Sequence, residues 1–181
     1  MRAVTRAVTG LALLALLAGC ARAPAPQAGY RAAGTPIYSN AVFLPDRLAG
    51  GWMQVADFAP AGSGACAARG LMVTPGGAGQ LTVEADLCLG GETRRYAGPA
   101  AVTGPGRIRL TAADPAGIGA EWWVLWVDAD YRTLVVGTPS GSFGMILNRT
   151  SDLPPDRLAA AREVLAWNGY DLGRMRTVGP R

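Results

Sequence analysis

Short apolar runs alternate with glycine- and proline-containing turns from Gly50 onward, at intervals of roughly ten residues. This spacing is typical of an all-β sandwich or barrel. The pattern predicts eight strands, at about residues 51–58, 65–74, 80–89, 92–102, 106–111, 121–128, 131–137 and 142–149. The segments between them, such as 75–79 and 104–106, offer turn conformations.

The period of the apolar pattern changes after residue 149 from that of a strand to that of a helix. A proline and an aspartate at 155–156 supply helix-start chemistry. Apolar residues then recur at helical spacing, at Leu158, Ala161, Val164 and Leu165. Asn168 and Gly169 form a typical helix end. We therefore expect one amphipathic helix over about residues 155–167, packed on the outside of the strands.

The first residues read as a targeting segment rather than as structure. Arg2 and Arg6 precede an apolar run at 11–17, which is shorter than the ~20 residues that a membrane-spanning helix needs. The run ends in Leu-Ala-Gly at 17–19 followed by Cys20, which resembles the lipobox of bacterial lipoproteins. This resemblance implies a signal peptide at 1–19, cleavage before Cys20, and fatty acylation of that cysteine, palmitate included. A plain secretory signal with an incidental cysteine is the alternative.

Residues 20–42 are rich in alanine and proline and lack periodicity, so we expect the lipidated cysteine and a flexible tether there. The folded domain is expected to occupy residues 43–181. The resemblance to bacterial lipoproteins also implies a sorting rule, in which aspartate after the cysteine favours retention in the inner membrane, and this sequence has Ala21 there. The expected location is therefore the cell envelope, at the periplasmic face of the outer membrane.

Cys66 and Cys88 remain once Cys20 is acylated, and an oxidising compartment favours their pairing. Their midpoint is residue 77, the centre of the predicted turn between the second and third strands. A hairpin about that turn places the two cysteines opposite each other, and it pairs Leu71 with Val83. We expect a Cys66–Cys88 disulfide, with two free buried thiols as the alternative.

Charge and composition exclude several classes of function. The net charge is +4, all 17 basic residues are arginines, and removing Arg2 and Arg6 leaves about +2 on the mature chain. The arginines are scattered, so no nucleic-acid-binding stripe is visible. The absence of histidine and lysine removes the commonest general base, the commonest metal ligand and Schiff-base chemistry. We expect no enzyme activity, no cofactor and no metal site.

Three stretches resemble the lipocalin family. Gly50-Gly51-Trp52 is similar to the G-x-W motif of the first lipocalin strand. Residues 127–137 resemble the second family motif, and 145–150 resemble the third, which ends in Arg149. Their order, and the helix behind them, are similar to the bacterial and apolipoprotein-D-like branch. The resemblance implies an eight-stranded up-and-down antiparallel barrel with one C-terminal α-helix packed on its outside.

The resemblance also implies a barrel base in which Arg149 stacks over Trp52. Residues that alternate with that tryptophan should then face the lumen. On this ground Gln54, Ala56 and Phe58 are expected to line a ligand site. The strand at 121–128 is apolar on both faces, one toward the lumen and one under the helix. We expect Trp122, Val124 and Trp126 inside, and the opposite face is the alternative. The sequence departs from the family at Gln54, where a carboxylate is usual, and at Met145, where tryptophan is common.

The expected function is carriage, storage or scavenging of a small apolar or amphiphilic ligand, of the fatty acid or lysophospholipid class, by a membrane-anchored monomer. Gln54 and one of Arg94, Arg95 or Arg107 would lie near its polar head group. Two alternatives stay open. One is a periplasmic protease-inhibitor barrel with an inhibitory N-terminal arm, and the other is a structural envelope lipoprotein with a filled core.

Overall fold

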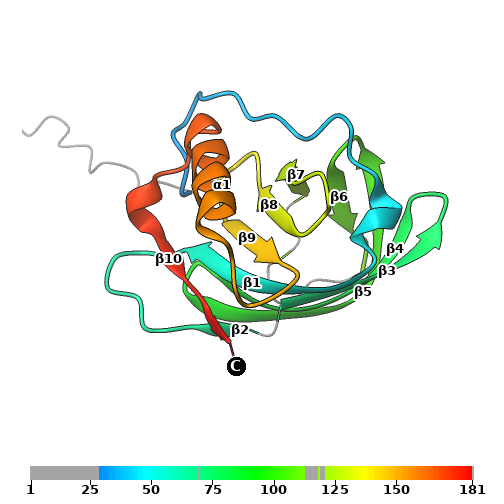
Figure 1. Cartoon of the computed structure of the whole chain (residues 1–181), viewed down its shortest axis with the longest axis horizontal. Helices are drawn as coiled ribbons and strands as arrows, with labels where there is room; N and C mark the ends of the chain where they lie inside the picture. The colour runs from blue at the N-terminus through cyan, green and yellow to red at the C-terminus, as the bar shows by residue number, and fades with distance from the viewer. Residues whose placement is uncertain (1–28, 69, 113–117, 119–120, 181) are drawn as a thin grey trace, which may run out of the picture.

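A computed structural model describes residues 29–68, 70–112, 118 and 121–180. The cleavage site and the lipidation of Cys20 lie outside these residues. The chain forms a closed antiparallel barrel with one helix against its wall (Figure 1). Its elements in order are η1 Pro45–Leu48, β1 Gly50–Phe58, β2 Ala67–Ala68, β3 Gly70–Gly77, β4 Gln80–Leu89, β5 Glu92–Gly104, β6 Arg107–Leu110, β7 Trp122–Val127, β8 Thr133–Gly137, β9 Gly144–Asn148, α1 Pro155–Trp167, η2 Leu172–Arg174, β10 Met175–Thr177 and β11 Gly179–Pro180.

The barrel wall follows chain order. Strands β1, β3, β4, β5, β6, β7, β8 and β9 pair in sequence, and the β1–β9 pairing closes the ring. The predicted eight-stranded up-and-down barrel and its C-terminal helix are thus confirmed. The chain enters β1 at one end of the barrel, which we call the base. The other end, reached after β1, β4, β6 and β8, we call the mouth.

Apolar side chains on the inner faces of the strands form one continuous cluster. It contains Trp52 of β1, Leu71 of β3, Tyr96 of β5, Trp122 of β7 and Met145 of β9, all buried. The alternation of strand residues turns every second side chain into this core. Burial of this apolar surface is the main stabilising term of the barrel.

Strands β1 and β7 each contain a β-bulge, which changes the residues that face inward from those predicted. In β1, Val55 is an extra residue between the pairs Gln54–Leu147 and Ala56–Ile146. In β7 the register shifts in the same way between Val124 and Trp126. An extra residue turns the rest of the strand over.

Alternation predicted that Ala56, Phe58 and Trp126 line the lumen. The bulges make this prediction wrong for all three residues. They belong instead to a second cluster, which lies between the outer wall and α1 and includes the buried helix residues Ala161 and Leu165.

The hairpin register of β3 and β4 also differs from the prediction. Leu71 pairs with Ala85 rather than with Val83, a shift of two residues. The hairpin turns at Ala78-Gly79, where both residues have positive φ, as a tight two-residue connection requires. A shift of two keeps each side chain on its predicted face.

The wall splits at the mouth, and the C-terminal residues fill the gap. Beyond Trp52, β1 no longer pairs with β3 and pairs instead with β10. Strand β11 continues alongside β2 in parallel. Figure 1 shows β10 crossing beside β1, with the C-terminus beside β2. The predicted Cys66–Cys88 disulfide is confirmed, with a Cα–Cα distance of 6.0 Å, and Val178 packs against it.

The N-terminal boundary of the folded body also needs correction. Residues 29–42 were expected in the tether, but they lie against the barrel. The Tyr30 amide donates to the Gly141 carbonyl at 2.6 Å, and the Asn40 amide donates to the Val124 carbonyl at 2.7 Å. The ring of Tyr30 packs 5.9 Å from that of Phe58. The contacts of this segment with the barrel are isolated and not periodic. The pattern of polar and apolar residues therefore could not predict that it is folded.

Candidate functional site

Arg149 and Trp52 lie together at the base. The guanidinium carbon is 3.7 Å from the centre of the indole ring, in cation–π geometry. The guanidinium also donates to the carbonyls of Gly51, Arg47 and Tyr131. Burial lowers the pKa of Arg149, yet arginine stays protonated. This pair joins β1, η1 and the end of β9, and its role is structural.

Buried apolar side chains fill most of the interior between base and mouth. Trp122 and Val124 lie in the inner cluster with Leu87, Val136 and Leu147. These side chains offer van der Waals contact and no charge. The interior therefore suits a hydrocarbon group rather than an ionic one.

Gln54 also faces inward, and both ends of its amide bind the backbone. Its Oε1 accepts from the Cys88 amide at 2.6 Å, and its Nε2 donates to the Cys88 carbonyl at 2.8 Å. The side chain thus bridges β1 and β4 where β3 no longer lies between them. These two hydrogen bonds give Gln54 a structural role in the wall.

An ion pair missed by the sequence reasoning lies at the mouth. Asp57 is fully buried and faces the same side as Met145 because of the bulge in β1. The Arg176 Nε donates to its Oδ1 at 2.8 Å, and Arg176 Nη1 donates to the Gly64 carbonyl. Nothing in the sequence pattern signals the bulge or the C-terminal strand, so this pair could not be foreseen.

The three arginines considered for a head group lie in different places. Arg94 pairs with Leu87 across β4 and β5 and therefore shares its inner face. Arg95, the next residue, faces outward and is 3.2 Å from Asp86. Arg107 lies on the outer wall, 4.3 Å from the ring centre of Trp123.

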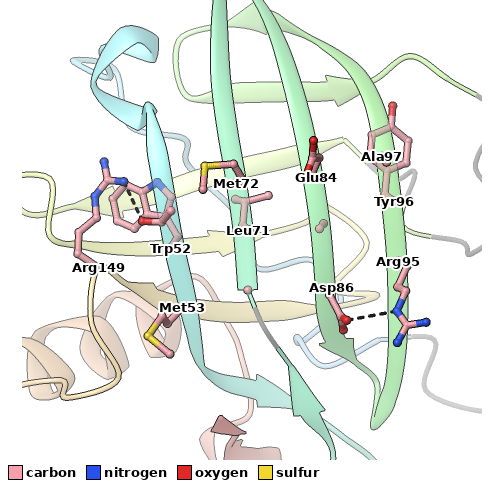
Figure 2. A pocket seen from close by; sticks show the side chains of 13 residues that line it. Trp52, Met53, Leu71, Met72, Glu84, Asp86, Arg95, Tyr96, Ala97 and Arg149 are labelled. Carbon is pink, nitrogen blue, oxygen red and sulfur yellow. Dashed lines mark hydrogen bonds and ion pairs between the residues drawn. The ribbon is translucent and has the colours of Figure 1, made fainter. Parts of the chain in front are cut away.

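A hollow of about 830 Å³ lies on the outer wall over β1, β3, β4 and β5 (Figure 2). Outward side chains border it, among them Met53, Met72, Glu84 and Arg95. Met72 is about half exposed. The exposed side chains at its border, Met72, Glu84 and Arg95, belong to the outer face, and its lining also includes Trp52, Leu71, Ala85 and Tyr96 of the inner cluster.

The described residues lack two kinds of feature. They contain no group of three or more histidine, cysteine, aspartate or glutamate side chains placed to hold a metal ion. Among these residues no helix is long and apolar enough to cross a membrane.

Comparison with known proteins agrees with this geometry. Residues 45–180 match the lipocalin-like domain family, and the chain belongs to that family. Its fold is that of a lipocalin barrel. A segment of 58 residues is 31% identical to temperature-induced lipocalin-1 of Arabidopsis thaliana, and it spans 32% of this chain and 31% of the plant protein.

Solved structures share the fold at low identity. Insecticyanin from the tobacco hornworm Manduca sexta has a TM-score of 0.60 and 14% identity, over 84% of this chain and 87% of its own. Lobster apocrustacyanin A1 has a TM-score of 0.52 and 17% identity, over 75% and 78%. The siderocalin Ex-FABP, which functions through dual ligand specificities, has a TM-score of 0.53 and 16% identity, over 75% and 95%.

Proposed function

We propose that this protein is a membrane-anchored lipocalin that holds a small apolar or amphiphilic ligand, of the fatty acid or lysophospholipid class, in the bacterial cell envelope. The observation that carries the proposal is the apolar lining of the barrel, which continues from Trp52 at the base to Leu87 near the mouth. Burial of a hydrocarbon chain there supplies affinity of about 25 cal/mol per Å² of apolar surface.

The anchor is proposed from the sequence around Cys20. Two or more acyl chains on one cysteine hold a protein firmly on a membrane, because each buried methylene contributes about 0.8 kcal/mol. The described body begins at residue 29, so about eight residues separate its first residue from the proposed lipid. That distance keeps the barrel close to the bilayer surface.

Expression of the full chain in a bacterium with two membranes tests the anchor. Intact mass should show loss of residues 1–19 and a gain of acyl chains. Cys20→Ser should keep residues 1–19 and gain none. Ala21→Asp is the matched sorting variant, expected to move the protein from the outer to the inner membrane fraction. An unacylated wild-type chain would contradict the anchor.

Native mass spectrometry of the same full-length protein tests the ligand. We expect a co-purified lipid, or saturable uptake of a fatty acid or a lysophospholipid. Absence of binding across a panel of such lipids would favour the filled-core alternative. Inhibition of an envelope protease without lipid binding would favour the inhibitor alternative. The structure gives that alternative no support, because residues 29–42 lie against their own barrel.

A further inference from the structure

We infer that Arg94 is the head-group residue of this barrel and that the ligand carries an anionic head, a carboxylate or a phosphate, which displaces Glu92 from Arg94 at the mouth. This inference rests on the proposed function and adds to it the charge and the position of the head group.

The register of β4 and β5 places Arg94 on the inner face. Residues directly opposite in an antiparallel pair share one face of the sheet. Arg94 is opposite Leu87, which is fully buried in the inner cluster, and Tyr96 is opposite Ala85 in the same cluster. Arg94 is therefore the inner-face residue just above the apolar lining on β5.

Charge on the inner face of the described strands is confined to the mouth. It consists of two ion pairs, Asp57–Arg176 and Glu92–Arg94. Below them the paired strands present apolar side chains to the core. A ligand with a hydrocarbon tail thus meets charge only at the height of Arg94, which fixes its head at the mouth and its tail toward the base.

The two pairs differ in how readily they release an arginine. Asp57 is completely buried and Arg176 also binds the Gly64 carbonyl, so breaking this pair would leave an unpaired buried carboxylate. Glu92 and Arg94 are 68% and 39% exposed and lie 2.6 Å apart. An exposed pair of this kind contributes little, and water solvates Glu92 when a ligand anion takes its place.

Arg95 supplies a matched control one residue away. It faces the outer wall and pairs with Asp86 across the sheet, as Figure 2 shows. Replacing either arginine with glutamine removes one positive charge from β5 and one ion pair, whose carboxylate partner is 68% exposed at Glu92 and 16% exposed at Asp86. Only the Arg94 substitution removes a charge from the inner face of the barrel wall.

The experiment measures binding of three radiolabelled probes to the full-length chain in phosphatidylcholine nanodiscs, with protein-free nanodiscs as background. Oleate, oleoyl lysophosphatidate and oleyl alcohol carry the same chain and differ in their heads. We expect both anions to bind the wild type more tightly than the alcohol. Arg94→Gln should weaken the anions about tenfold or more and leave the alcohol unchanged, since a charge-assisted hydrogen bond is lost.

Three further variants sharpen the outcome. Arg95→Gln should match the wild type for every probe, Arg94→Lys should keep part of the preference for anions, and Glu92→Gln should tighten the anions. A larger effect on oleate than on lysophosphatidate would identify a carboxylate site, and the reverse a phosphate site. Inorganic phosphate that competes with lysophosphatidate would show that the head group alone is recognised.

Equal binding of oleate and oleyl alcohol, or equal effects of the Arg94 and Arg95 substitutions, would overturn this inference and leave the proposed function standing. Failure of all three probes to bind the wild type would overturn both.

Discussion

Gln54 hydrogen-bonds both backbone groups of Cys88, across a part of the wall from which the intervening strand is missing. Its amide provides the donor and the acceptor that a neighbouring strand residue would otherwise provide. A carboxylate at this position would offer acceptors only. The amide of Gln54 thus suits the place where the wall splits.

Replacing Gln54 with leucine should lower the free energy of unfolding by about 2–4 kcal/mol, because the buried amide and carbonyl of Cys88 would both lose their partner. Urea denaturation followed by tryptophan fluorescence measures this. Gln80→Leu, at an exposed position of β4, serves as the control and should change stability by less than about 0.5 kcal/mol. Equal effects of the two substitutions would refute the bridging role of Gln54.

Arg149→Met should destabilise the barrel by about 2–4 kcal/mol, since it removes three hydrogen bonds and the stacking on Trp52. Arg149→Lys should recover little of this, because an ammonium lacks the planar fork that reaches three carbonyls. Thermal unfolding reports the loss, and Arg162→Met on the exposed side of α1 is the control. A fully stable lysine variant would show that charge alone suffices.

Stability should depend on pH through Glu121. Hydrogen bonds from Thr103 and Trp123, and the charge of Arg109, hold the pKa of Glu121 below its ordinary value of 4.5. The folded state therefore favours the ionised form, and this contribution is present above the unfolded pKa and lost as the pH falls through the folded one. The sign follows from a folded pKa that is lower than the unfolded pKa.

Urea denaturation of wild type and Glu121→Gln at several pH values measures this contribution. The difference in free energy of unfolding should be widest above about pH 6 and should narrow below pH 4.5. Glu163→Gln, on the exposed face of α1, controls for the loss of one negative charge. A difference for Glu121→Gln that stays constant with pH would show that its ionisation is not coupled to folding.

Reduction of the Cys66–Cys88 disulfide should loosen the C-terminal strands before the rest of the wall. The bridge closes a loop with a sequence separation of 22, for which chain entropy gives about 3 kcal/mol. It also holds β2, the neighbour of β11, and it packs on Val178. Hydrogen exchange under native conditions should show residues 175–179 losing protection first, while β4 and β5 stay protected. Uniform loss of protection would indicate global unfolding instead.

Much of this fold was predictable because its signals are local. Glycine turns mark the strands, and Pro155 and Gly169 delimit the helix with the same bounds in the sequence and in the structure. The disulfide followed from two cysteines near one hairpin.

The predicted lining was less accurate because one extra residue in a strand reverses every later side chain. The bulges near Val55 and Leu125 sent Phe58 and Trp126 to the outer wall. Neither bulge contains a glycine, so the sequence offers no local sign of it. The ion pair at the mouth requires Arg176 of β10. This strand is too short to show a periodic pattern, and the sequence does not reveal that it pairs with the distant strand β1.

The Asp57–Arg176 pair joins residues 119 positions apart in the sequence. Hairpins such as β3–β4 and β4–β5 need only short loops, whereas this contact must wait until distant parts of the chain meet. The β1–β9 pairing that closes the ring also joins distant parts of the chain, so we expect it to form late in folding, after most strands have found their neighbours. Until that closure the apolar inner faces are open to solvent, and the lifetime of this open state sets how long the chain is at risk of aggregation.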